Sequence, residues 1–328
     1  MPAVGGPSRP YNRRMSIRWS AFLLPLALFA AAAGAREYAL SPGSDVIGEV
    51  EVIRAAYEDT FFKLGRRYDV GYDELRHANP GVDPLLPGEG TEIVIPTQYV
   101  LPDAPRRGIV LNIPEYRLYY FPEDGGRVIT HPIGIGREGW TTPYGRTTVA
   151  GKTVKPTWYP PESIREEHAA NGDPLPAAVP PGPDNPLGDY ALRLGFPSYL
   201  IHGTNKPYGV GMRVSHGCIR MYPEDIEALF ALVEPGTPVT IINQPYKVGW
   251  GEGGLYLEAH RPLAEESEAW TATELTVRFV AATGTRRAEV RWDQADTVLA
   301  TGNGIPEFVS VEGTITVADL VDEPAAVE

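Results

Sequence analysis

The sequence of 328 residues contains a single cysteine, Cys218, and this scarcity is the first constraint on the protein. One thiol cannot form a disulfide within the chain, so the fold must depend on its hydrophobic core. Hydrophobic residues make up 43% of the chain, which is enough for a packed core and argues against general disorder. The lone thiol is therefore an inert buried side chain, a link between two chains, or a reactive group.

The chain also lacks an excess of basic residues, because 29 Lys and Arg stand against 42 Asp and Glu, a formal net charge of −13. A polyanionic partner needs a basic surface, so this balance argues against nucleic acid or an anionic membrane surface as the main partner. Residues 244–328 form an acidic C-terminal extension for which the sequence indicates no role. Weak alternation of apolar residues over 275–280 and 288–292 predicts a small β appendage there.

Long hydrophobic runs are missing except near the N-terminus. Residues 21–33 are apolar and follow a basic segment with Arg13, Arg14 and Arg18. The small residues Ala33-Gly34-Ala35 at the end of this run offer a cleavage site. This pattern is typical of a secretory signal, and the run is shorter than the ~20 residues of a spanning helix. We predict a signal peptide over residues 1–35, export to the periplasm or cell envelope, and no stable membrane insertion after cleavage. An uncleaved anchor is the alternative.

Proline and glycine are abundant, at 33 and 35 residues, which favours short strands and structured loops over long helices. A hairpin turn is expected at Asp124-Gly125-Gly126. Proline and acidic residues at 223–225 are typical of the first turn of a helix. The proline-rich stretch 155–186 is expected to be a packed lid. Alternation predicts strands over 108–112, 117–121, 128–133, 146–152, 190–194, 199–202 and 238–243. The fold class over residues 107–243 is therefore mainly β, a sandwich or barrel.

A smaller unit precedes this region. Apolar spacing predicts short helices within 57–68 and 72–78, and a strand follows at 91–96. Residues 46–97 resemble a LysM module, a β-α-α-β unit that binds glycan chains of cell-wall polymers. The resemblance is carried by Asp59-Thr60, Asn79-Pro80 and Ile93-Val94-Ile95-Pro96. A purely structural spacer is the alternative, and residues 98–106 are predicted to be a linker.

Two short stretches contain the residues that can carry chemistry, His202-Gly203-Thr204 and Ser215-His216-Gly217-Cys218-Ile219-Arg220. A thiol is a nucleophile only as thiolate, so a base should lie close to Cys218. His202 ends a predicted strand, and the glycines and proline that follow allow the chain to return to Cys218; His216 is the other candidate base. Gly217 permits a tight turn whose N–H groups point at a developing oxyanion, and Arg220 can bind a carboxylate.

The same residue types also occur in proteins without this chemistry. A lone cysteine is often a small buried side chain without reactivity. His202, His216 and Cys218 could be three zinc ligands, although no separate carboxylate base stands out. A papain-like peptidase places its cysteine well before its histidine, whereas His202 precedes Cys218.

The 20-residue stretch HGTNKPYGVGMRVSHGCIRM, residues 202–221, is similar to the active-site signature of the L,D-transpeptidase family. The stretches PTWYPPESIR and VPPGPDNPLG resemble the branch that includes the enzymes attaching Braun's lipoprotein to murein. The similarity covers about residues 107–262. The resemblance implies an L,D-transpeptidase-type β fold with one short helix after the nucleophile.

The resemblance also implies a role for individual residues. Cys218 would be the nucleophile and His202 the general base, oriented by the carbonyl group of Gly203. The N–H groups of His216, Gly217 and Cys218 would form the oxyanion hole. The expected substrate contacts are Arg220, Ser215 and Gly211.

The implied partners are the stem peptides and glycan strands of peptidoglycan, with a diaminopimelate amine or an outer-membrane lipoprotein lysine as acceptor. Neither a metal nor an organic cofactor is implied. The alternative function is a cell-wall glycan-binding protein whose catalytic domain is inactive or accessory.

Overall fold

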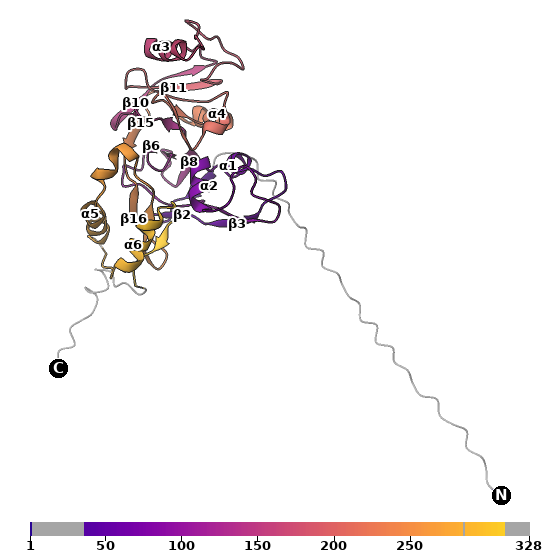
Figure 1. The fold of residues 1–328 in the computed structure, drawn as a ribbon. Coiled ribbons are helices and arrows are strands. Elements are labelled where there is room, and N and C mark those ends of the chain that lie inside the picture. The colour runs from indigo at the N-terminus through magenta and orange to yellow at the C-terminus, as the bar shows by residue number, and fades with distance from the viewer. Residues whose placement is uncertain (2–35, 285, 312–328) are drawn as a thin grey trace. The chain divides into compact units, whose positions relative to one another are not determined.

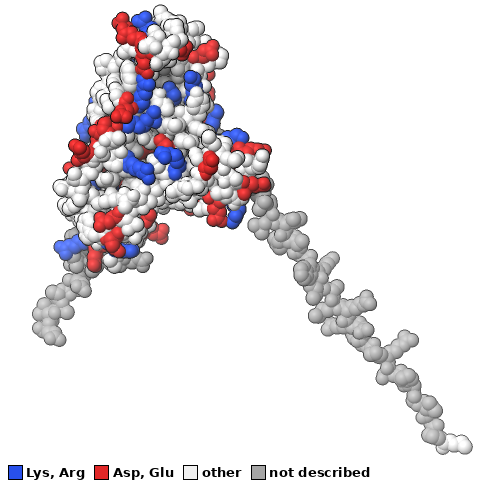
Figure 2. All heavy atoms as spheres, in the orientation of Figure 1, with Lys and Arg blue, Asp and Glu red and all other residues white. Residues whose placement is uncertain are grey.

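The structure is a computed structural model that describes Met1, residues 36–284 and residues 286–311. The predicted signal peptide, Met1 apart, lies outside the described residues. In the described part of the chain, no helix has both the length and the apolar character needed to cross a membrane. On the face drawn in Figure 2, acidic and basic side chains are mixed, without a continuous basic surface.

One large sheet dominates the region predicted to be β. Its strands are β1 (Arg36–Ala39), β6 (Gly108–Asn112), β7 (Arg117–Phe121), β8 (Arg127–Pro132), β10 (Gly145–Val154), β11 (Tyr190–Leu194), β12 (Leu200–His202), β14 (Ile219–Arg220) and β15 (Pro238–Ile242). They follow the order β1-β8-β7-β6-β15-β10-β11-β12-β14. Figure 1 labels β8, β6, β15, β10 and β11 of this sheet. Every strand predicted from alternation in this region is present, with small shifts at some ends, so the mainly β fold class is confirmed.

The pairing of these strands explains how distant segments meet. β7 and β8 are antiparallel and are joined by the predicted turn at Asp124-Gly125-Gly126. β15 runs parallel to β6 on one side and antiparallel to β10 on the other, so it joins the two halves of the sheet. β12 and β14 run parallel, with Ile201 opposite Ile219 and His202 opposite Arg220.

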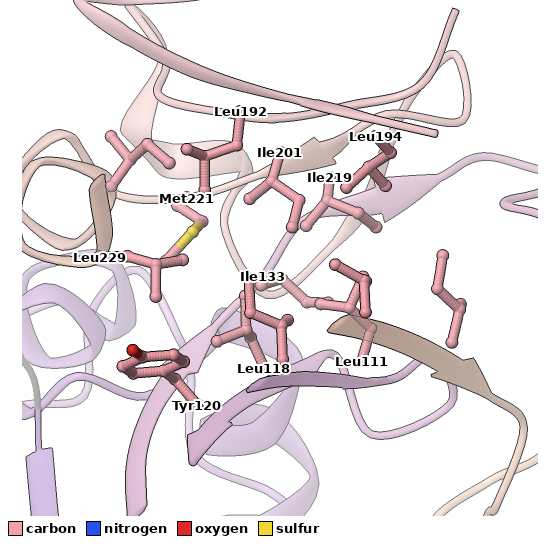
Figure 3. Close-up of a cluster of buried hydrophobic side chains, with 14 of the residues drawn as sticks. Leu111, Leu118, Tyr120, Ile133, Leu192, Leu194, Ile201, Ile219, Met221 and Leu229 are labelled. Carbon is pink, nitrogen blue, oxygen red and sulfur yellow. The ribbon is translucent and has the colours of Figure 1, made fainter. Parts of the chain in front are cut away.

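The main core lies against this sheet. Ile201 of β12 and Ile219 of β14 are buried in it, together with Leu229 of the helix α4 (Pro223–Leu232) (Figure 3). The predicted helix therefore begins at Pro223 as expected, and it packs its apolar side chains into the core. Because side chains alternate along a strand, the burial of Ile201 and Ile219 turns their neighbours to the opposite face.

The N-terminal unit has the predicted β-α-α-β order. β3 (Glu51–Arg54) pairs antiparallel with β4 (Glu92–Ile95), and α1 (Phe61–Tyr68) and α2 (Tyr72–Ala78) lie between them in sequence. The side chain of Thr60 caps α1 by accepting a hydrogen bond from the Lys63 N–H. A separate small core holds the unit together, with the buried residues Ala55, Phe61, Leu64, Val70, Leu75, Ile93 and Ile95.

The predicted linker at residues 98–106 is not a free connection. It begins with strand β5 (Gln98–Val100), which pairs with β2 (Val46–Gly48). Tyr99, Val100 and Leu101 are buried, and Tyr99 and Leu101 share an apolar cluster with Val110 and Tyr119 of the large sheet. The apolar side chains of this segment explain the difference, because they pack instead of remaining in solvent.

The C-terminal extension differs from the predicted β appendage. It contains β16 (Tyr246–Gly251), β17 (Gly254–Ala259) and β18 (Glu307–Phe308), with α5 (Ala272–Thr283) and α6 (Trp292–Thr301) beside them, and a 3-10 helix η2 (Ala264–Ala269) (Figure 1). The prediction of a strand over 275–280 is wrong. Leu275 and Phe279 are buried whereas Val277 between them is exposed, which is the spacing of a helix.

The stretch 155–186 is packed, as predicted, but it includes a helix, α3 (Glu162–Ala170). The buried side-chain amide of Asn185 donates hydrogen bonds to the carbonyl oxygens of Pro156, Val179 and Pro180. These bonds tie the end of the stretch to its beginning. The segment is therefore a structured cover and not a loose loop.

A buried ion pair joins the N-terminal unit to the large sheet. The guanidinium of Arg117 on β7 is fully buried and lies 2.7 Å from the Glu74 carboxylate of α2. The same guanidinium donates to Thr130 of β8 and lies over the ring of Tyr99. Breaking a buried pair leaves one charge without a partner in a medium of low polarity, which is strongly unfavourable.

We expect Arg117→Leu to lower the free energy of unfolding by about 3–5 kcal/mol, because the Glu74 carboxylate stays buried alone. Denaturant unfolding followed by tryptophan fluorescence measures this change. The ion pair between Arg54 and Glu92 is exposed, so Arg54→Leu is the matched control and should change the stability little. Equal losses in the two variants would contradict a special role for the buried pair.

Candidate active site

The two stretches singled out in the sequence meet in one cavity of about 650 Å³. Its lining includes His202 from the first stretch and Cys218 and Arg220 from the second. Aromatic side chains form much of the remaining wall, with Trp140, Trp158, Tyr159 and Tyr199 among them. Trp158 and Tyr159 belong to the cover predicted at 155–186, so that cover forms part of the cavity wall.

The parallel pairing of β12 and β14 places these groups. Ile201 and Ile219 are directly opposite each other and point into the core. The next residues, His202 and Arg220, are also paired and point away from it toward the cavity. Cys218 immediately precedes β14 and lines the same cavity, half-buried. A shift of one residue in this register would bury the polar groups and expose the isoleucines.

The hydrogen bond of His202 determines which ring nitrogen carries the proton. Its Nδ1 lies 2.6 Å from the carbonyl oxygen of Gly203, and a carbonyl oxygen can only accept, so Nδ1 is the donor. Burial lowers the pKa of His202 to about 3, and the Arg220 guanidinium acts in the same direction. The imidazole is therefore neutral at pH 7, with a lone pair on Nε2 that can accept a proton.

The thiol of Cys218 is also neutral at rest. Burial raises the pKa of the Cys218 thiol, while the Leu200 backbone N–H and the Arg220 guanidinium act against this rise. Among the described residues, the thiol's hydrogen-bond acceptor is the carbonyl oxygen of Ser198, 3.7 Å from Sγ. The thiol proton is therefore directed at this carbonyl oxygen, and a transfer of that proton to another group would require the thiol to turn.

The turn before Cys218 is fixed by Ser215. The Ser215 hydroxyl donates to the carbonyl oxygen of Cys218 at 2.6 Å and accepts from the Gly217 N–H at 3.1 Å. Gly217 has φ +96°, which a residue with a side chain rarely adopts. Ser215 was predicted to contact substrate, but its hydroxyl is used to hold this turn. Of the three N–H groups predicted for the oxyanion hole, that of Gly217 is already occupied, which leaves those of His216 and Cys218.

Arg220 provides a positive charge in the cavity wall. Its Nε is buried and has no hydrogen-bond partner among the described residues. Burial lowers the pKa of Arg220, although a guanidinium remains charged in proteins. A buried, unpaired N–H of this kind is a strong site for a carboxylate.

His216 points toward α3. Its Nε2 lies 3.1 Å from a Glu167 carboxylate oxygen and 3.0 Å from Nη2 of Arg137. Glu167 also forms an ion pair with Arg137, and the edge of Trp140 packs on the imidazole of His216. Sequence reasoning missed Arg137, Glu167 and Trp140. Glu167 was missed because helix α3 was not recognised within the proline-rich stretch, whereas Arg137 and Trp140 lie in a separate loop that only tertiary packing brings to His216.

Two further expectations concern Gly211 and a zinc site. Gly211, predicted to contact substrate, is not part of the cavity lining: its Cα region lies against the backbone of Gly71 and Tyr72 at the start of α2, and its φ is +75°. The glycine allows a close approach of two backbones at this point. The ligand atoms of His202, His216 and Cys218 do not converge on one point in the described part of the chain, so the alternative zinc site is not supported.

A thiol, a neutral imidazole and a guanidinium in the wall of one cavity, together with nearby backbone N–H groups, are a set of groups that can carry out acyl transfer. The model of the L,D-transpeptidase catalytic domain matches residues 106–241. The probable L,D-transpeptidase YcfS of Escherichia coli K12 is 46% identical over 258 residues, which cover 76% of this chain and 81% of that protein.

A second relative is the probable L,D-transpeptidase ErfK/SrfK of Escherichia coli K12, 41% identical over 281 residues, which cover 83% of this chain and 90% of that protein. The NMR structure of the catalytic domain from the E. faecium L,D-transpeptidase is 24% identical, covers 43% of this chain and 100% of that one, and has a TM-score of 0.33. From the two sequence relatives, the chain belongs to the L,D-transpeptidase family. It is a transpeptidase enzyme.

We expect alkylation of Cys218 by iodoacetamide to accelerate through the alkaline range without a plateau near neutral pH, because the raised pKa keeps the thiol protonated there. Mass spectrometry of the protein measures the rate directly, since no other thiol is present. Arg220→Gln should slow alkylation further, whereas Arg220→Lys should keep more of the rate. A plateau reached below pH 7 would show that the resting group is a thiolate.

Proposed function

We propose that the protein is an exported peptidoglycan L,D-transpeptidase in which Cys218 is the nucleophile and His202 the general base. The observation that carries this proposal is the register of β12 and β14, since it puts the single thiol and a neutral imidazole in the wall of one cavity. The Gly203 carbonyl group supports the assignment, because it holds His202 in the tautomer whose Nε2 can accept a proton.

The first step forms a thioester. As Nε2 of His202 takes the thiol proton, Sγ of Cys218 attacks the carbonyl carbon between diaminopimelate and the terminal D-alanine of a tetrapeptide stem. The N–H groups of His216 and Cys218 stabilise the oxyanion, and that of Gly217 joins them if Ser215 releases it. When the intermediate collapses, the C–N bond breaks and D-alanine leaves with the proton from His202.

The second step transfers the acyl group to an amine. His202 takes a proton from the attacking amine, the new amide bond forms, and the C–S bond breaks to restore the thiol. A diaminopimelate amine as acceptor gives a 3→3 cross-link, and a lipoprotein lysine anchors that lipoprotein to the wall. The acceptor must reach the thioester past the aromatic side chains of Trp158 and Tyr159.

Two features support binding of a peptidoglycan substrate: the positive charge of Arg220 and the N-terminal β-α-α-β unit. Arg220 lines the cavity, and its positive charge supports the proposal that its guanidinium binds a carboxylate of the stem peptide, which is anionic. The β-α-α-β unit, which resembles a LysM module, would bind glycan strands and keep the enzyme on its polymeric substrate. The predicted signal peptide is consistent with action in the periplasm or cell envelope.

Release of D-alanine from a tetrapeptide stem tests the proposal. Cys218→Ala should leave a folded protein, with an unchanged thermal transition, that releases no detectable D-alanine. Removing the base should be nearly as severe: we expect His202→Ala to lower the rate by about 10²–10⁴. His216→Ala is the matched control, because the Nε2 of His216 is bound by Glu167 and Arg137, and it should keep most of the rate.

The opposite pattern of D-alanine release would contradict the roles assigned to Cys218 and His202. Near-normal release by His202→Ala with loss in His216→Ala would make His216 the base. Release by Cys218→Ala would refute the thioester route altogether. An inactive wild-type protein that still binds murein would favour the glycan-binding alternative.

A further inference from the structure

Three buried side chains outside the cavity converge on one point. Asp69 follows the last residue of α1, His131 lies on β8, and Asp225 is in the first turn of α4. Their exposed fractions are 4%, 0% and 2%. Nδ1 of His131 is 3.8 Å from an Asp69 oxygen and 3.5 Å from an Asp225 oxygen, and one ligand atom from each residue lies within 4.8 Å of the others.

These groups lack the partners that buried polar atoms require. Both ring nitrogens of His131, Oδ1 of Asp69 and Oδ2 of Asp225 have no hydrogen-bond partner among the described residues. The other Asp69 oxygen accepts from the backbone N–H of Arg36. In the part of the chain that the structure describes, neither carboxylate forms an ion pair with Lys or Arg. Two buried carboxylates without a compensating positive charge are strongly unfavourable.

A second cluster, also made of two carboxylates and one histidine, shows how the protein neutralises buried carboxylates with one of its own side chains. Glu115, Glu258 and His260 also converge and are also buried. There the ammonium of Lys247 lies 2.8 Å from Glu115 and 2.7 Å from Glu258, and His260 Nε2 lies 2.6 Å from Glu258. The lysine supplies the positive charge. The cluster of Asp69, His131 and Asp225 also has two carboxylates and an imidazole but no such lysine. The Arg117 guanidinium acts on both carboxylates without forming an ion pair with either, so no contacting positive charge from Lys or Arg neutralises them in the described part of the chain.

We propose that Asp69, His131 and Asp225 bind a divalent transition-metal ion, with Zn²⁺ as the expected occupant. One imidazole nitrogen and two carboxylate oxygens are a donor set that suits Zn²⁺. A metal–ligand bond of about 2.0–2.1 Å in tetrahedral geometry separates neighbouring ligand atoms by about 3.4 Å. The observed 3.5 and 3.8 Å from Nδ1 to the two carboxylates need only a small contraction.

The competing source of positive charge is a proton. Burial raises the pKa of Asp225 to about 7 and raises the pKa of Asp69 well above its usual range, so a proton shared by the two carboxyl groups would also relieve the repulsion. A shared proton leaves both nitrogens of His131 without partners, whereas a metal ion satisfies Nδ1 as well. The unsatisfied imidazole is therefore the observation that favours a metal ion.

The ion would have a structural role. Asp69 belongs to the β-α-α-β unit, His131 to the large sheet, and Asp225 to the helix that follows the Cys218 stretch. One ion would hold these three elements together. None of the three residues lines the cavity that contains Cys218, so the ion takes no part in the acyl transfer.

Metal content and thermal stability test the site. The Cys218→Ser variant serves as the parent protein, so that the thiol cannot contribute a ligand. After treatment with EDTA and addition of ZnCl₂, gel filtration followed by elemental mass spectrometry should find one Zn²⁺ per chain, and the thermal midpoint should rise by several degrees. Adding His131→Gln to this parent should abolish both effects. Adding His168→Gln, which changes an accessible histidine, should leave both unchanged.

A second measurement covers the case in which the His131→Gln variant does not fold. Co²⁺ added to the Cys218→Ser protein should give visible d–d absorption bands, which Zn²⁺ displaces in a one-to-one ratio. No retained Zn²⁺ and no Co²⁺ spectrum would overturn the proposal in favour of the shared proton. Full Zn²⁺ retention by a folded His131→Gln variant would also overturn it, by placing the ion elsewhere.

Discussion

The parallel pairing of β12 with β14 is the constraint on which the active site depends. Two isoleucines, Ile201 and Ile219, anchor this pair in the core from opposite strands. Their burial forces His202 and Arg220 to the other face, where Cys218 also lies. The apolar core thus sets the geometry of the proposed active site, because the energy that fixes the register comes from buried isoleucine and not from the polar groups themselves.

Burial also sets the protonation states. The same packing that holds His202 and Cys218 removes them from water, which keeps the imidazole unprotonated and the thiol protonated. Arg220 acts on both groups, since its charge disfavours imidazolium and favours thiolate. The pair at rest is therefore neutral. In the proposed reaction, charge develops when an electrophilic carbonyl carbon arrives, and near neutral pH the resting thiol is only weakly nucleophilic.

The sequence allowed most of the large sheet, both N-terminal helices and the meeting of His202 with Cys218 to be predicted, because each rests on a local pattern or on one continuous motif. Where two patterns overlap, prediction failed. The alternation of Leu275, Val277 and Phe279 fits a strand, whereas the four-residue spacing of Leu275 and Phe279 fits a helix. Only the structure decides between the two, because Leu275 and Phe279 are buried and Val277 is exposed. The role of Gly211 was missed for another reason: its contact with Gly71 is set by tertiary packing that no local pattern encodes.

The central claim is a covalent acyl group on the sulfur of Cys218. Rapid mixing of the enzyme with a tetrapeptide stem, acid quenching and peptide mass spectrometry test it most directly. The account predicts a tripeptide adduct on the fragment that contains Cys218, formed as fast as D-alanine appears and removed when an amine acceptor is added. Steady release of D-alanine with an unmodified Cys218 at every time point, or an adduct on another residue, would contradict it.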